Sequence, residues 1–119
     1  MSEQKQKITF GKFQNIDMRV ALVVGVEDAT GTRSPARVLD LDLGELGRRR
    51  SVGQFALVDS DELIGAKLIA CVNLGEREMG PYVSEALVLG TPHPDSPEGQ
   101  SQAMPLRADP AASPGDAVY

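Results

Sequence analysis

The clearest pattern in this chain lies between residues 38 and 55, in the stretch VLDLDLGELGRRRSVGQF. Over Val38–Leu43, leucines alternate with aspartates, and this two-residue period predicts a strand with one buried face. We expect the leucines to point inward and the aspartates, Asp40 and Asp42, to point outward. Glycines at both ends of residues 44–47 predict the turn of a hairpin, after which Arg48–Phe55 returns as the next strand.

A longer strand is expected before this hairpin, over residues 17–27. Its large apolar side chains fall on one parity, which predicts a half-buried strand, and Gly25 suits a bulge or a sharp bend. The glycine, serine and proline of residues 28–36 predict a loop. Upstream, Thr9 is placed to cap a short helical turn whose two phenylalanines, Phe10 and Phe13, point inward. The apolar side chains of the predicted inner face are Met18, Val20, Leu22, Val24 and Val26.

After the hairpin the period changes. Asp59 followed by Glu62 resembles a capping box, and Gly65 is placed to end this helix after a turn or two. Two further strands are expected, and the proline-rich end predicts a loop, a short strand, and a terminus held down by Val118 and Tyr119. The ranges are 67–73 and 84–90 for the strands, 74–83 for an irregular connection between them, 91–100 for the loop and 103–106 for the short strand.

The resulting order is three strands, a short helix and two strands. This is the chain order of the OB-fold, an all-β, five-stranded Greek-key barrel, here with N- and C-terminal extensions. A small antiparallel sandwich has the same order of elements. The length of 119 residues predicts a single domain over residues 1–119.

Charge is unevenly distributed along the chain. The net charge is −5, whereas a generic binder of polyanions is basic. Residues 1–50 carry nine Lys/Arg and seven Asp/Glu, or +2, and residues 51–119 carry three Lys/Arg and ten Asp/Glu, or −7. Any anion-binding face is therefore expected to draw on the first half of the chain.

Several functional classes lack their signatures in this sequence. No apolar run approaches the roughly 20 residues of a membrane span, and the polar N-terminus does not resemble a signal peptide. The single cysteine, Cys71, is expected to be a buried strand thiol, and His93 is the only histidine. We therefore expect a cytoplasmic protein without membrane insertion, metal or cofactor, and not an enzyme.

Arginines are the first candidates for ligand contacts. Arg48 and Arg50 share one face of their strand, and guanidinium groups suit phosphates as well as carboxylates. The alternative is cross-strand pairing with the aspartates of the preceding strand. Arg33 and Arg37 flank a proline in the loop that often meets the ligand of an OB-fold. The alternative for this pair is a surface position without a partner.

Polar residues in apolar strands and a lip beside Gly80-Pro81 complete the candidates. The polar set faces either a ligand groove or solvent, or is buried and satisfied locally. The lip either contacts ligand side chains or simply packs the long connection, and Phe55 is a further candidate for an apolar surface. The polar set is Ser51, Gln54, Asn73, Ser84 and Glu85, and the lip is Met79 and Tyr82.

Eight short segments, in order, resemble one family. They are IDMRV (16–20), RSPA (33–36), LDLG (41–44), RS (50–51), ELIG (62–65), VNL (72–74), GP (80–81) and SEALVLG (84–90). Together they resemble the tRNA-binding-domain family of OB-folds, and RSPA and SEALVLG are similar to its CsaA secretion-chaperone branch. The resemblance implies a homodimer without metal or cofactor, in which the candidate polar residues line the groove.

The same resemblance implies two kinds of ligand. Stand-alone members of the family bind tRNA, whereas CsaA-type members bind unfolded or exported polypeptides. The family often has lysine after the first arginine of RSPA, and an aromatic residue then lysine after its alanine, where this chain has Ser34, Arg37 and Val38. With fewer basic residues, we expect a polypeptide as the ligand, with tRNA as the alternative.

Overall fold

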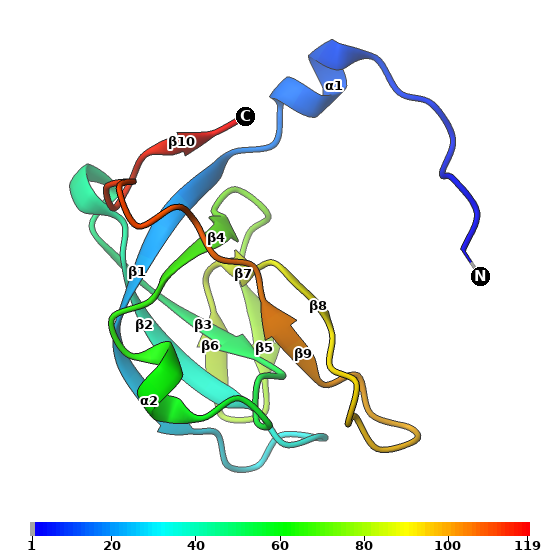
Figure 1. Ribbon diagram of the computed structural model, residues 1–119, viewed down its shortest axis with the longest axis vertical. Coiled ribbons are helices and arrows are strands. Elements are labelled where there is room, and N and C mark those ends of the chain that lie inside the picture. The colour runs from blue at the N-terminus through cyan, green and yellow to red at the C-terminus, as the bar shows by residue number, and fades with distance from the viewer. Residues whose placement is uncertain (1) are drawn as a thin grey trace.

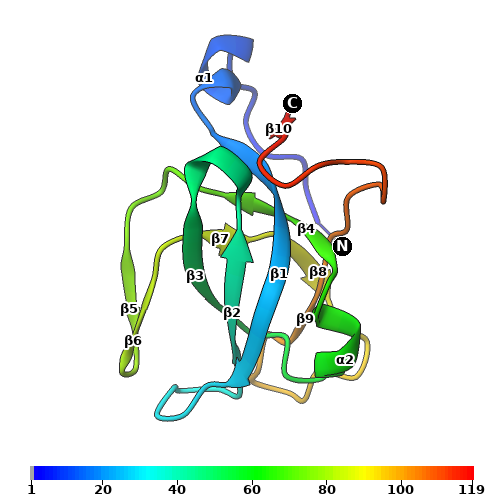
Figure 2. The same cartoon turned by 90° about the vertical axis from the view of Figure 1, so that its left-hand side faces the viewer.

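The computed structural model describes residues 2–119, and most of its regular structure is β-strand. One sheet runs in the order β3-β2-β1-β4-β7, with β10 added alongside β1, and it curls into a barrel (Figures 1 and 2). Two small hairpins, β5-β6 and β8-β9, stand outside this sheet. The strands are β1 (Met18–Asp28), β2 (Arg37–Asp42), β3 (Arg48–Gly53), β4 (Lys67–Cys71), β5 (Arg77–Met79), β6 (Tyr82–Ser84), β7 (Leu87–Val88), β8 (Gly90–Pro92), β9 (Ala103–Pro105) and β10 (Ala117–Val118).

The predicted hairpin forms one end of this sheet. Strands β2 and β3 pair antiparallel from Arg37↔Gly53 to Asp42↔Arg48, and a 3-10 turn, η1 (Gly44–Leu46), joins them. Leu39, Leu41 and Leu43 are fully buried, as predicted. With the short helix α2 (Ser60–Leu63) between β3 and β4, this is the predicted OB-fold.

Strand β1 forms where predicted, but its predicted inner face is only partly right, since Val20 is buried and Val26 packs against the core while the middle of the strand uses the other parity. Ala21 and Val23 point into the core, whereas Val24 is 37% exposed on the outer face. The alternation of apolar and polar residues could not show which face of β1 is buried, because both the even-numbered and the odd-numbered positions carry apolar side chains. The expected irregularity at Gly25 is confirmed by a register shift against β2, where a Cβ would lie only 2.8 Å from Asp40 Oδ2.

The N-terminal turn forms as helix α1 (Phe10–Gln14), but it does not fold onto the core. Thr9 caps it by accepting the Lys12 N–H at 3.2 Å. Helix α1 stands away from the barrel (Figure 1), so the expectation that Phe10 and Phe13 point inward is wrong for Phe10, which is 73% exposed. The two rings instead lie against each other, with centroids 6.2 Å apart.

The second half of the chain is more finely divided than predicted. The connection over 74–83 contains most of the β5-β6 hairpin, and the strand expected over 84–90 shortens to β7. At the C-terminal end, β9 pairs with β8 and Val118 of β10 pairs with Met18, which confirms an end held against the barrel. Tyr119, expected to help hold it, is fully exposed. Within residues 2–119, no helix has the length and apolar character needed to cross a membrane.

Candidate binding surfaces

One end of the outer face of β2 and β3 carries a charged pocket, which we call the arginine pocket. Its volume is about 420 Å³. The strand register brings its charges together, because Arg50 lies opposite Asp40 and Arg48 opposite Asp42. The residues that line it are Val24, Asp40, Arg48, Arg49, Arg50 and Glu85.

The three arginines of this pocket have different partners. Arg50 pairs with Asp40 at 3.2 Å and lies 3.9 Å from Glu27, so the cross-strand alternative describes it. Arg49 donates to the Val72 carbonyl oxygen at 3.2 Å. Within residues 2–119, no carboxylate lies within 4 Å of the Arg48 guanidinium. Among the described residues, the pocket therefore offers one guanidinium, that of Arg48, with neither a carboxylate partner nor a side-chain hydrogen bond.

Ser51, Ser84 and Glu85 close the barrel between β3 and the segment that enters β7. Ser51 Oγ donates to the Ala86 carbonyl oxygen at 2.8 Å, and Ser84 Oγ accepts the Val52 N–H at 3.0 Å. Both serines are buried, whereas Glu85 is half-buried. The two serines are thus buried polar groups with hydrogen-bond partners inside the barrel, which was one of the alternatives. Their contact with a ligand stays a prediction.

The other end of this outer face is covered by the β5-β6 hairpin, which stands beside β3 in Figure 2. Met79 and Tyr82 pack there against a small apolar cluster of Ala36, Val38 and Val52. These two residues therefore pack the connection inward, and their role as a ligand lip stays a prediction. The exposed apolar side chains nearby are Leu74, Val83 and Leu87.

The two arginines of the β1–β2 region do not form one site. The side chain of Arg37 turns inward and donates to the Val58 carbonyl oxygen at 2.9 and 3.2 Å. Arg33 is exposed in the loop. About five residues of strand β2, or roughly 17 Å, separate this loop from the arginine pocket. The predicted residues therefore fall at two ends of the sheet rather than around one groove.

Three further candidates, Asn73, Phe55 and Gln54, do not line the arginine pocket. Asn73 holds the start of β1, since its Oδ1 accepts the Asp17 N–H at 2.9 Å and its Nδ2 donates to the Asn15 carbonyl oxygen at 2.8 Å. Phe55 is core, so its prediction as a surface residue is wrong, and Gln54 has a buried Oε1 without a partner among residues 2–119.

Gln102 is 1% exposed and links the Pro35 and Ala56 backbones, at 2.8 and 3.0 Å. Sequence reasoning missed it because a glutamine in a proline-rich loop has no signature of burial.

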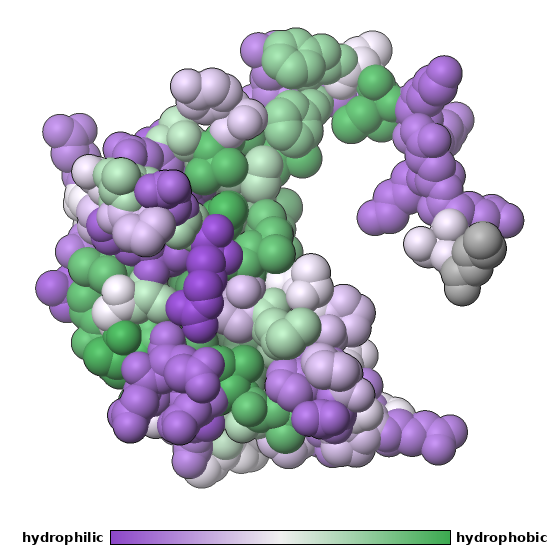
Figure 3. All heavy atoms as spheres, viewed as in Figure 1, coloured by the Kyte–Doolittle hydropathy of each residue, from purple (hydrophilic) through white to green (hydrophobic). Residues whose placement is uncertain are grey.

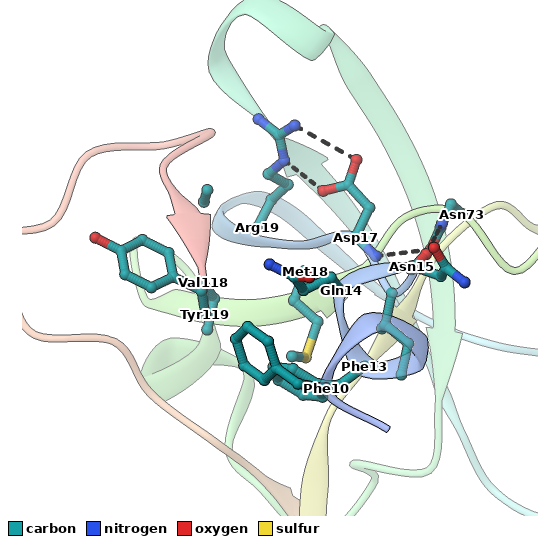
Figure 4. Close-up of a pocket in the computed structure, with 12 residues that line it drawn as sticks. Phe10, Phe13, Gln14, Asn15, Asp17, Met18, Arg19, Asn73, Val118 and Tyr119 are labelled. Carbon is teal, nitrogen blue, oxygen red and sulfur yellow. Dashed lines mark hydrogen bonds and ion pairs between the residues drawn. The ribbon is translucent and has the colours of Figure 1, made fainter. Parts of the chain in front are cut away.

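A second hollow, the terminal groove, lies between α1 and β10 and has a volume of about 580 Å³. Phe10, Met18 and Tyr119 lie around it (Figure 4). Figure 3 shows apolar residues gathered over α1 and the neighbouring barrel surface. Arg19 borders the groove and bonds Asp17 at 2.6 Å. This hydrogen bond raises the pKa of Arg19 above its ordinary value, so its charge is permanent.

Among residues 2–119, no group of three or more His, Cys, Asp or Glu side chains is arranged to hold a metal ion. The predicted burial of Cys71 is confirmed.

The barrel, with its short helix between β3 and β4, defines the chain as an OB-fold domain. It is similar to two solved structures, the CsaA chaperone protein of Picrophilus torridus (32% identity, TM-score 0.84, 95% of this chain and 100% of that one) and the chaperone CsaA of Bacillus anthracis (29%, 0.83, 96% and 100%). It is also 37% identical, over 91% of its length, to a methionine–tRNA ligase of Polaromonas, of which it spans 16%. Models of protein families give no match. The chain belongs to the CsaA-like family.

Proposed function

We propose that this chain is a non-catalytic, cytoplasmic binding protein that holds unfolded or exported polypeptide segments, and that it acts as a homodimer. The observation that carries the proposal is the charge pairing of the arginine pocket. Arg50 already has Asp40 and Glu27 as partners, and Glu85 stands at the same edge. A polypeptide is the ligand that suits such a mixed surface.

Phosphate recognition would need more free cations in one place. Affinity for nucleic acid rises with the number of phosphates neutralised, because each contact releases counterions. Within residues 2–119, Arg48 and Arg49 have no carboxylate partner, but Arg49 is hydrogen-bonded to the Val72 carbonyl oxygen, and Arg33 lies at the far end of β2. The similarity to two CsaA chaperones supports the same ligand class.

The homodimer draws support from the terminal groove. Phe10 and Tyr119 are both exposed and both line the terminal groove. Helix α1, which carries Phe10, stands away from its own barrel (Figure 1). Contiguous exposed apolar patches mark association surfaces. A dimer presents two ligand sites, and a long unfolded chain that engages both gains avidity without any new contact.

The second candidate function is tRNA binding. The similarity to a methionine–tRNA ligase over 91% of this chain favours it. In that case Arg33 and Arg48 would contact phosphates, together with the exposed lysines of the N-terminal segment, Lys5, Lys7 and Lys12. The net charge of −5 opposes this function except through such local contacts.

One experiment separates the two functions. Binding of the full chain to bulk tRNA and to an unfolded, reduced polypeptide is measured across a salt series. We expect polypeptide binding with a shallow salt dependence and weak binding of tRNA. Tight tRNA binding with a steep salt slope, lost in Arg48→Ala/Arg50→Ala, would overturn the polypeptide proposal. The control Arg77→Ala/Arg107→Ala removes the same charge from exposed positions outside the arginine pocket.

A further inference from the structure

The free edge of β3 has three equivalent backbone positions, two of which are occupied. Strand residues alternate, so the backbone N–H and C=O groups of every second residue point away from β2. At Val52 the N–H goes to Ser84 Oγ, at 3.0 Å. At Arg50 the N–H goes to Glu85 Oε1, at 2.9 Å, and the carbonyl oxygen accepts the Glu85 N–H, at 2.8 Å. The next position on this edge is Arg48.

Arg48 is open in both its backbone and its side chain. Within residues 2–119, its backbone has no hydrogen bond outside the β2-β3 ladder. Its guanidinium has no carboxylate within ion-pair distance in this part of the chain, and Asp42, directly opposite, accepts the Gly44 N–H through its Oδ1 at 2.9 Å. The turn at η1 therefore engages the Asp42 carboxylate, which the strand register places opposite Arg48.

We infer that Arg48 is the docking position for an acidic residue of an extended polypeptide. The ligand residue pairs its backbone with the open edge at Arg48, and its carboxylate pairs with the Arg48 guanidinium on the same face. This assignment rests on the proposed function and names its preferred ligand class, which is a segment with Asp or Glu in an extended conformation.

Glu85 shows that the next position on this edge accepts a polypeptide segment. Its backbone N–H donates to the Arg50 carbonyl oxygen, and its carboxylate accepts the Arg50 N–H. A sugar–phosphate backbone has no N–H to offer to such an edge, whereas every non-proline peptide unit has one. The combination of an open backbone position and one free guanidinium thus favours an acidic peptide over RNA.

The test uses three fluorescent, unstructured peptides that are identical except for Glu, Gln or Lys at the central position. Fluorescence anisotropy is recorded with the full chain at low and at moderate salt. We expect the Glu peptide to bind about three- to fivefold more tightly than the Gln peptide, which is the range of one cross-strand ion pair, and the Lys peptide to bind most weakly. N-methylation of the central Glu is expected to weaken binding further, because the backbone N–H is lost.

Variants of the protein test whether Arg48 causes the preference for the Glu peptide. Arg48→Gln is expected to abolish the difference between the Glu and Gln peptides, and Arg48→Glu to reverse the order toward Lys. Arg107→Gln is the matched control, since it removes an exposed arginine outside the arginine pocket and should leave the preference intact. Equal binding of all three peptides would overturn this inference while the proposed function stands. Failure of both the peptides and an unfolded polypeptide to bind would overturn both, and tighter binding of a short single-stranded RNA than of the Glu peptide would overturn the ligand class.

Discussion

Glu85 pairs twice with Arg50, through its backbone N–H to the carbonyl oxygen at 2.8 Å and through its Oε1 to the N–H at 2.9 Å. The side chain thus replaces the second strand that the edge of β3 lacks at this point. We predict that Glu85→Ala lowers the free energy of unfolding by about 1–2 kcal/mol, because the Arg50 N–H loses its acceptor. Urea denaturation followed by circular dichroism measures the change.

Glu85→Gln is the control for this effect. Glutamine retains an oxygen at the same place and should preserve most of the stability, since the bond needs an acceptor and not a charge. Equal losses in Glu85→Ala and Glu85→Gln would show that the charge of Glu85, rather than its hydrogen bond, stabilises the edge.

Arg37 gives a second prediction, which concerns stability rather than binding. Its side chain is 16% exposed and donates to the carbonyl oxygens of Phe55, Ala56 and Val58, which hold the segment after β3 in place. Arg37→Met should cost about 2–3 kcal/mol of unfolding free energy by leaving these carbonyls without a donor. Removal of only its ion-pair partner, in Asp28→Asn, should cost less than about 1 kcal/mol, since Asp28 is 81% exposed.

Binding measurements on the same variants test the earlier expectation for Arg37. If Arg37→Met folds with reduced stability and retains its affinity for an unfolded polypeptide, Arg37 acts only within the fold. A loss of affinity at a temperature where the variant is fully folded would restore it as a ligand contact.

The β2–β3 hairpin was predictable because its leucines and aspartates alternate strictly and its turn is bounded by glycines. The inner face of β1 was not, because Ala21 and Val23 are as compatible with a core as Leu22 and Val24, and only the packed barrel chooses between them. The β5-β6 hairpin was missed because its strands have three residues each, which is too short for a period to show.

The candidate site was predictable as a set of residue types but not as a geometry. The sequence placed Arg48 and Arg50 on one face correctly, yet their difference arises from Asp42, which pairs with the Gly44 N–H instead of Arg48. Partner choice of this kind depends on turn geometry that periodicity does not record. For the same reason the sequence left open whether Ser51 and Ser84 face a ligand groove, solvent or the interior, and the structure buries both.

Tyr82 carries a third prediction, for the contact between the β5-β6 hairpin and the β1–β2 loop. Its hydroxyl oxygen accepts the Thr30 N–H at 3.1 Å and lies 3.3 Å from Thr30 Oγ1. Tyr82→Phe keeps the ring against the Val38 cluster and removes these bonds, so we expect a loss of about 0.5–1.5 kcal/mol. Hydrogen exchange should become faster at the Thr30 amide, while the β2–β3 ladder stays protected. Faster exchange throughout the barrel would show instead that the hairpin is part of one cooperative unit with the core.

The terminal groove gives the last prediction, which concerns the proposed dimer. Phe10 is 73% exposed in the single chain, and a phenylalanine buried in an interface contributes about 1.5–3 kcal/mol. Phe10→Ser should therefore raise the dissociation constant of the dimer at least about tenfold, measured by analytical ultracentrifugation over a concentration series. Leu57→Ser is the matched control, since Leu57 is also an exposed apolar side chain but lies beside α2, away from the groove. Because α1 has few contacts with its own barrel, Phe10→Ser should leave the unfolding free energy of the monomer unchanged. Particles of 12.7 kDa for the unmodified chain at micromolar concentration would rule out the dimer, and with it the avidity of two linked binding sites.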